Sequence, residues 1–197
     1  MTKFDELNKL KRYFSVMEIP QSEKDKRVSL GNFLYDAFLY VFLLMRTEAK
    51  IKGIIDKDYY IPSLEGRIMD VLDENGVSYE ENYVPTLAKE VIDTTARHLD
   101  DDYYFSQERA LLVAQNEAST IYNTIDYMDA KSQGKKYKRW VAELDNATRP
   151  WHVDVDGTKI PIDDMFQVGT DSMRFPHDYA NGSPENIINC RCVCEYE

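Results

Sequence analysis

The chain has 197 residues with a net charge of −11 at pH 7, and 43% of its residues are hydrophobic. This composition excludes an intrinsically disordered chain, because enough apolar surface is present to form a core. The acidic balance argues against general binding to the phosphate backbone of nucleic acids, which depends on clustered Lys and Arg. The three cysteines and a start without an apolar run predict neither a disulfide framework nor a secretory signal.

The first 133 residues predict a mostly helical region. A short helical pattern ends near Pro20, and a longer one covers residues 24–52. The apolar run at 33–45 is shorter than the about 20 residues that span a bilayer, so we expect a buried helix and no membrane contact. Then follow a loop at 56–62, a short helix at 67–73, a turn at 74–76 and a helix at 85–98.

A long helix is predicted from Ser106, a favourable N-cap residue, to about Ser132. Its apolar residues alternate spacings of three and four, which is typical of a narrow seam that packs against another helix. A helix of another chain is a plausible partner for this seam. The seam residues are Leu111, Ala114, Ala118, Ile121, Ile125 and Met128.

After Gly134 the periodicity changes to that of strands. We expect strands at 137–144 and 159–162, a hairpin at 153–158 around Asp156-Gly157, a short extended segment at 166–169, and a closing strand at 188–196. The sequence therefore predicts an α+β fold. In this interpretation, residues 1–133 form the helical region, and residues 134–197 form a small antiparallel β module with long loops.

The last strand places Cys190, Cys192 and Cys194 on one face, and His152 and His177 lie in loops that can fold over it. Zinc binds cysteine and histidine with tetrahedral geometry, so we take His152, Cys190 and Cys192 as candidate zinc ligands. The C-x-C spacing differs from the usual C-x₂₋₄-C. Buried thiols beside hydrogen-bonded imidazoles are the alternative interpretation.

Two further interpretations concern charged side chains. His152, Asp156 and His177 can serve a metal-dependent hydrolase or nuclease, although the Asp-Gly turn explains Asp156 equally well. A short basic cluster suggests contact with nucleic acid, although such a cluster is more often a solvated surface. The basic residues are Lys135, Lys136, Lys138 and Arg139.

A third interpretation is structural, with aromatic anchors and charge-assisted hydrogen bonds that hold the loops, and with Arg149 bridging acidic side chains. It rests on an ordered set of uncommon residues: K-x-W-x-A-x-x-D-x-x-T-R-x-x-H, then D-G, then a Phe-bearing segment, then Pro, then N-C-R-C. This order resembles the Mu F-like head morphogenesis family, the minor capsid proteins of tailed bacteriophages. The matching residues, hereafter the signature residues, are Trp140, Ala142, Asp145, Thr148, Arg149, His152, Asp156, Gly157, Phe166, Gly169, Pro176, Asn189, Cys190, Arg191 and Cys192.

The resemblance implies a structural virion component without catalytic residues. Members of the family are few per virion and associate with the portal protein and the capsid interior. The expected partners are therefore the portal protein, the major capsid protein and packaged DNA, and residues 1–133 are expected to face portal or capsid. The expected role is in head assembly, genome packaging or ejection. The expected location is the virion, at the capsid interior or portal vertex, after assembly in the host cytoplasm.

Overall fold

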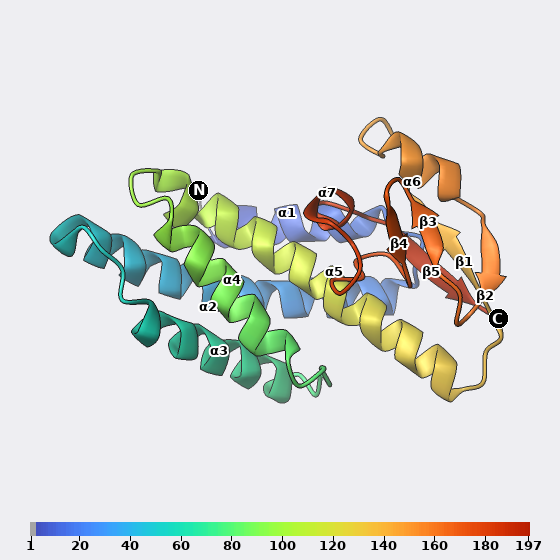
Figure 1. The fold of residues 1–197 in the computed structure, drawn as a ribbon, viewed down its shortest axis with the longest axis horizontal. Coiled ribbons are helices and arrows are strands. Elements are labelled where there is room, and N and C mark those ends of the chain that lie inside the picture. The colour runs from blue at the N-terminus through green and yellow to red at the C-terminus, as the bar shows by residue number, and fades with distance from the viewer. Residues whose placement is uncertain (1–2) are drawn as a thin grey trace. The chain divides into compact units, whose positions relative to one another are not determined.

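The computed structural model describes residues 3–197 and confirms the predicted α+β class, with helices first and a small antiparallel sheet towards the C-terminus (Figure 1). The elements are α1 (Lys3–Ser15), α2 (Gln21–Lys52), α3 (Lys57–Glu74), α4 (Tyr83–Ala96), the 3₁₀-helix η1 (Asp102–Phe105), α5 (Gln107–Ser132), β1 (Tyr137–Val141), α6 (Pro150–Val155), β2 (Lys159–Pro161), β3 (Phe166–Val168), β4 (Asp171–Met173), α7 (Pro184–Ile187) and β5 (Val193–Tyr196).

The chain divides into two compact units. Unit 1 combines Met1–Val28 with Gln115–Glu197, and unit 2 is the continuous segment Ser29–Ala114. Unit 1 therefore contains α1, the start of α2 and most of α5 in addition to the sheet. The separate β module at 134–197 stays a prediction about which part of the chain folds alone.

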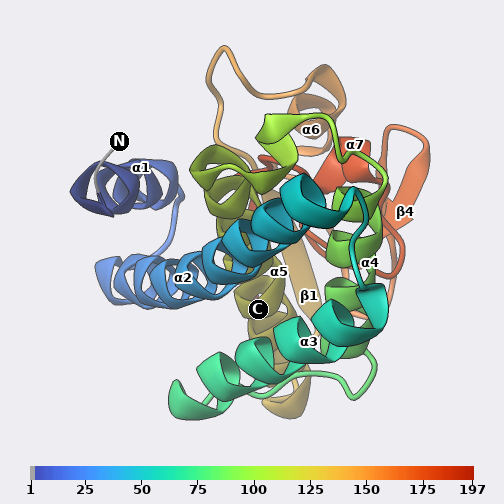
Figure 2. The same ribbon diagram turned by 90° about the vertical axis from the view of Figure 1, so that its left-hand side faces the viewer.

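Unit 2 is built on the inner side of α2. Phe38, Val41, Phe42 and Met45 are completely buried there, and their spacing of three and four places them on one stripe of the helix. Helices α3 and α4 pack against each other in the same unit (Figure 2). Exposed apolar side chains remain elsewhere on α2, because Phe33 and Leu43 keep 44% and 47% of their surface exposed.

The predicted loop at residues 56–62 is wrong, because α3 already begins at Lys57. Asp56 caps this helix, accepting a hydrogen bond from the backbone N–H of Tyr59 at 3.3 Å. Pro62 lies inside the helix and removes one backbone donor, which is what made this segment look like a loop. The burial of Tyr60 and Leu64 on the inner face outweighs that loss.

Helix α2 has 32 residues and is long and apolar enough to cross a membrane by length and composition alone. Half of its most apolar window is nevertheless buried within the structure. The core helix of a globular protein meets the same criterion. The expectation of a buried helix without membrane contact therefore stays a prediction.

The predicted start of the long helix is confirmed, because the Ser106 hydroxyl accepts a hydrogen bond from the backbone N–H of Arg109 at 3.1 Å. The predicted seam is correct only at its beginning. Leu111, Ala114, Ala118 and Ile121 are buried, whereas Ile125 is half-buried and Met128 is 54% exposed. In the last turns the buried positions are instead Asn123, Tyr127 and Ala130.

Replacing Ser106 by alanine is expected to lower the free energy of unfolding by about 1 kcal/mol, because one N–H at the start of α5 loses its acceptor. Urea denaturation followed by far-UV circular dichroism measures this loss. Ser106→Asp keeps an acceptor and is the matched control, with a change near zero. An equal loss in both variants would contradict a capping role.

The sheet of unit 1 has the strand order β2-β1-β5, and both pairings are antiparallel. Trp140 in β1 lies opposite Cys194 in β5. Strands β3 and β4 form a separate hairpin, in which Val168 pairs with Asp171. The two-residue turn between them begins with Gly169, whose φ of +60° suits a tight hairpin.

The predicted hairpin at 153–158 is wrong, because residues 150–155 form helix α6. Pro150 at the first helical position favours this helix, and His152 and Val155, three residues apart, bury one face. The alternation of valine and aspartate at 153–156 matches the pattern of a strand. The burial of His152 and Val155 on one face stabilises the helix instead. The closing strand is also shorter than predicted, because only 193–196 pair with β1.

Candidate functional site

The loop at residues 145–149, hereafter the signature loop, is held by an ion pair between two signature residues. Arg191 donates from Nη1 and Nη2 to the two carboxylate oxygens of Asp145, at 2.6 and 2.7 Å. The Arg191 hydrogen bond, followed by that from the Ala147 N–H, lowers the pKa of Asp145 well below its ordinary range. Arg149 does not bridge acidic side chains as expected; its Nη2 donates to the carbonyl oxygen of Ile188 at 2.6 Å.

The Asp156-Gly157 turn joins α6 to the sheet. The backbone N–H of Ala142 donates to the Asp156 carboxylate at 2.8 Å, and the N–H of Gly157 donates to the Trp140 carbonyl at 2.9 Å. Gly157 has a φ of +72°, which explains why glycine follows the aspartate. Both signature residues at this turn therefore make local structural contacts.

Polar side chains of α5, for which the sequence predicted no role, hold the loops that precede β5. Gln115 Nε2 donates to Asn189 Oδ1 at 2.6 Å, and the Asn189 N–H donates to Asn116 Oδ1 at 2.8 Å. Asn123 Nδ2 donates to the carbonyl oxygen of Pro176 at 2.9 Å. The contacts from Gln115 and Asn116 hold Asn189 in a left-handed conformation with a φ of +59°. The available signal was a row of polar residues at helical spacing on α5, with Ser119 and Thr120 between Asn116 and Asn123.

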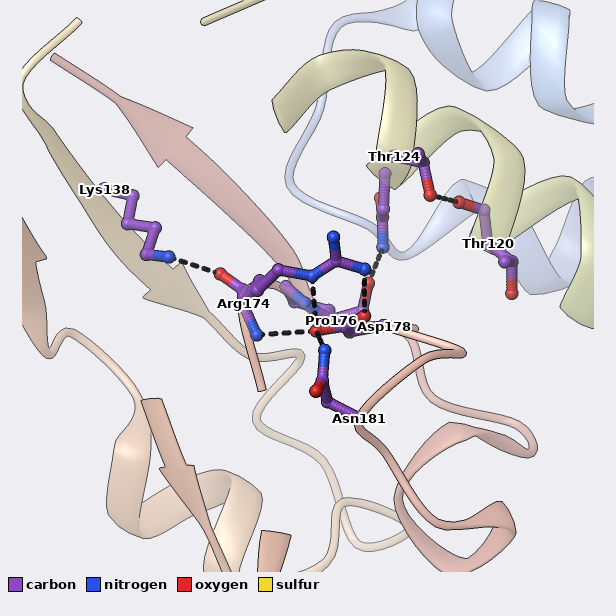
Figure 3. A network of polar contacts seen from close by, with 8 residues as sticks. Thr120, Thr124, Lys138, Arg174, Pro176, Asp178 and Asn181 are labelled. Carbon is purple, nitrogen blue, oxygen red and sulfur yellow. Dashed lines mark hydrogen bonds and ion pairs between the residues drawn. The ribbon is translucent and has the colours of Figure 1, made fainter. Parts of the chain in front are cut away.

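A second polar network surrounds the completely buried Asp178 (Figure 3). Its carboxylate accepts from the Arg174 backbone N–H, Nε and Nη2 at 2.8, 2.9 and 2.6 Å, and from Asn181 Nδ2 at 2.8 Å. Lys138 Nζ donates to the Arg174 carbonyl oxygen at 2.6 Å. Burial opposes ionisation of Asp178, but the hydrogen bonds from Arg174 and Asn181 outweigh it and lower the pKa of Asp178.

The structure brings His152, Cys190 and Cys192 into one buried cluster, with ligand atoms that all lie within 4.8 Å of one another. His152 Nδ1 lies 3.4 Å from the Cys192 sulfur and 3.7 Å from the Cys190 sulfur. Cys190 and Cys192 are both buried. Cys194 is half-buried and lies outside this group.

The orientation of the His152 ring is fixed by Asn186. Asn186 Nδ2 donates to the Val168 carbonyl at 3.0 Å and to Asp171 at 2.8 Å, so its Oδ1 is the acceptor for His152 Nε2 at 3.1 Å. The proton of the neutral imidazole is therefore on Nε2, and the lone pair of Nδ1 faces the two thiols. No pattern in the sequence indicated a role for Asn186.

The three hydrolase candidates are not brought together. Among residues 3–197, no metal-sized group of His, Cys, Asp or Glu includes Asp156 or His177. His152 and His177 are 1% and 0% exposed, so a polymer substrate has no access to either ring. His177 instead donates from Nε2 to the Cys190 carbonyl oxygen at 2.6 Å.

The basic cluster is only partly available to a partner. Lys138 is 1% exposed, so its ammonium group is absent from the surface where nucleic acid was expected. Burial lowers the pKa of Lys138 to about 8. Arg139 forms ion pairs with Glu195 and Glu197 at 3.9 and 3.4 Å. Lys135 and Lys136 remain for a contact with nucleic acid, which stays a prediction.

A groove with a volume of about 640 Å³ lies beside the signature loop in unit 1. Four cationic side chains line it, two from α1 and two from the signature residues. This group of cations, in which Arg191 is paired with Asp145 and Lys9 with Glu6, contrasts with the net charge of −11 of the whole chain. The lining residues are Lys9, Arg12, Tyr13, Val16, Ala147, Arg149, Asn189 and Arg191.

Comparison with known proteins identifies the same region. A family model described as "Phage Mu protein F like protein" matches residues 86–195, which is more than half of the chain. The protein named "NAD(+)--arginine ADP-ribosyltransferase EFV" of Enterococcus faecalis (strain ATCC 700802 / V583) is 30% identical over 102 residues, covering 50% of this chain and 20% of that protein. "Uncharacterized protein YqbB" of Bacillus subtilis (strain 168) is 33% identical over 100 residues, covering 48% and 32%. No solved structure matches.

Proposed function

Because the chain belongs to the phage Mu protein F like family, we propose that it is a minor head protein of a tailed bacteriophage that binds the portal protein and the major capsid protein during head assembly. Its place would be the capsid interior at the portal vertex, with a role in genome packaging or ejection. The observation that carries the proposal is that the family match at 86–195 covers the whole network of signature residues. The chain spans 20% and 32% of the two relatives above, so their activities do not transfer to it.

The internal contacts of the signature residues support a structural role. Asp145, Asp156 and Asn189 each bond to another part of unit 1, so their side chains hold loops in place. A hydrolase would instead need His152 and His177 at a surface, and both are buried. The transferase name belongs to a protein of which one fifth is matched, and it gives no catalytic residue in this chain.

The cationic groove of unit 1 is the surface on which we propose that a head protein docks an acidic segment. Its volume of about 640 Å³ suits side chains or a short segment. Lys9 and Arg12 are exposed and three residues apart on α1, so both face one partner. Contact with packaged DNA would involve Lys135 and Lys136 only.

Co-expression with the portal and major capsid proteins of the same phage tests the proposal. We expect the tagged chain to capture at least one of them, and the double variant Lys9→Glu/Arg12→Glu to bind about tenfold more weakly, because each substitution places a like charge against an acidic partner. Lys11→Glu is the matched control, since Lys11 is exposed on α1 but does not line the groove.

Two different failures can be told apart in this experiment. If the unmodified chain captures neither head protein, the proposed function is wrong. If the unmodified chain and the double variant bind equally well, the function stands and docking at the groove is wrong. Loss of binding in the Lys11→Glu control as well would mean that charge alone, and not this groove, governs association.

A further inference from the structure

We propose that His152, Cys190 and Cys192 bind a zinc ion inside unit 1, with Nδ1 and the two sulfurs as its protein ligands. This inference concerns what holds the module together and does not depend on the proposed docking partner. His152 belongs to α6. Cys190 and Cys192 follow it by 38 and 40 residues and belong to the segment that precedes β5. One ion would therefore join helix α6 to the segment that precedes β5.

The distances between the ligand atoms fit a tetrahedral ion. Zinc–sulfur bonds of about 2.3 Å and zinc–nitrogen bonds of about 2.0–2.1 Å place a nitrogen and a sulfur about 3.6 Å apart. The observed separations from His152 Nδ1 are 3.4 Å to Cys192 and 3.7 Å to Cys190. Two sulfurs and one imidazole nitrogen are also ligands that favour zinc over magnesium or calcium.

Space for one small additional ligand is present beside the cluster. A cavity of about 10 Å³ is lined by His152, Cys190 and Cys192 together with the signature loop. This volume corresponds to about one water molecule. A water in the fourth position, together with the three protein ligands, would complete the tetrahedron.

The surrounding hydrogen bonds prepare the cluster for a cation. Asn186 holds the His152 proton on Nε2, which leaves Nδ1 as a lone pair directed at the sulfurs. Such an outer hydrogen bond is the usual way in which a metal-binding histidine is oriented. Trp151 Nε1 also donates to Asn186 Oδ1 at 2.5 Å, so the amide cannot turn over without losing two donors.

Hydrogen bonding between neutral thiols explains the cluster less completely. The Nδ1 lone pair of His152 accepts one S–H group, although two sulfurs lie within 3.7 Å of it. The Trp140 Nε1–H is buried next to the Cys192 thiol but makes no full hydrogen bond to any acceptor among residues 3–197. A zinc-bound thiolate at Cys192 would give this N–H a charged acceptor, whereas a neutral thiol is a weak one.

The proposed binding step balances in protons and charge. On binding, each of the two cysteine thiols releases one proton to solvent, and no electron is transferred. The ion and two thiolates then have no net charge, and the imidazole is neutral. Burial of the complex is therefore far less costly than burial of a free cation.

The metal itself is the probe in the decisive experiment. The full chain is purified under reducing conditions, its zinc content is measured by mass spectrometry, and cobalt is then substituted for zinc. We expect about one zinc per chain, and cobalt should give the thiolate charge-transfer absorption and the intense d–d bands of a tetrahedral sulfur site. A chelator in excess should lower the melting temperature of the zinc-bound chain by about 8–16 °C. This is the shift expected when a protein of this size loses a ligand that was present at a thousand times its Kd.

Matched variants locate the ion. Cys192→Ser and His152→Gln should weaken zinc binding more than tenfold, and Asn186→Ala by about 10–100-fold through the orientation of His152. Cys194→Ser removes the third thiol, and His98→Gln removes an exposed histidine; both should bind zinc as the unmodified chain does.

The proposal is overturned if the unmodified chain holds no zinc after reconstitution and gives no cobalt spectrum, or if Cys190 and Cys192 are found joined as a disulfide. It is also overturned if Cys192→Ser and His152→Gln both bind zinc with unchanged affinity. Should these variants fail to fold, the cobalt spectrum and chelator response of the unmodified chain decide the question alone.

Discussion

Replacing Asp178 by alanine is expected to lower the free energy of unfolding by about 3 kcal/mol, near the lower end of the range for breaking a buried ion pair. Asp178 is completely buried and accepts four hydrogen bonds from Arg174 and Asn181. Without it, these donors lose their acceptor. Arg174 keeps 27% of its side chain exposed and can regain contact with water, which is why we expect the lower end.

The stabilisation of the fold by Asp178 should decrease as the pH falls. Because the pKa of Asp178 is lower in the folded than in the unfolded chain, its stabilisation is complete above the unfolded pKa and is lost as the pH falls through the folded pKa. The measurement is urea denaturation followed by tryptophan fluorescence, near neutral pH and again in acid. Asp163→Ala removes an exposed ion pair with Lys131 and should cost less than about 1 kcal/mol. Equal losses in the two variants would contradict the assigned role of Asp178.

Replacing Trp140 by alanine is expected to cost about 3–5 kcal/mol, the largest effect that we expect from a single substitution. The side chain is completely buried and meets Phe166 edge to face, with ring centroids 5.3 Å apart. Its ring also lies 5.8 Å from that of His152. Alanine would leave a cavity at the point where the sheet meets α6, and both apolar contacts would be lost.

Trp151 remains as the fluorescent reporter of unit 1 in the Trp140→Ala variant, because the chain has two tryptophans. Urea denaturation of both proteins therefore gives the difference directly. Leu144→Ala is the control, since Leu144 is 62% exposed and its truncation should change stability by less than about 0.5 kcal/mol. A loss below 1 kcal/mol for Trp140→Ala would mean that the centre of the unit lies elsewhere.

Local chemistry made several features predictable. Ser106 is followed by a helix because its hydroxyl satisfies a free N–H, and Asp156-Gly157 forms a turn because glycine adopts positive φ readily. The burial of Lys138 was also readable, since Lys138 and Trp140 share one face of a strand with a period of two. The basic residues next to Lys138 in the sequence obscured this signal. The rings of Tyr127 and Phe166, which lie against its ammonium group, come from other segments of the chain.

What the sequence could not provide are the contacts between distant segments. Gln115, Asn116 and Asn123 look like ordinary polar helix residues until the loops 53–74 residues later are placed against them. Asn186 likewise gains its role only through His152 and Val168. The sequence did group His152 with Cys190 and Cys192, and the structure places them together. The presence of zinc there remains a prediction.

One contact has a consequence for how the chain is made. The Tyr13 hydroxyl donates to the Cys190 carbonyl, 177 residues further along the chain, and unit 1 contains both ends of the sequence. Unit 2 is continuous and can close while translation is still under way. At about 5–20 residues per second, the first helix waits on the order of 10 s or longer for its partner to leave the ribosome. A nascent chain stalled before residue 190 should therefore hold unit 2 folded while α1 remains open to protease.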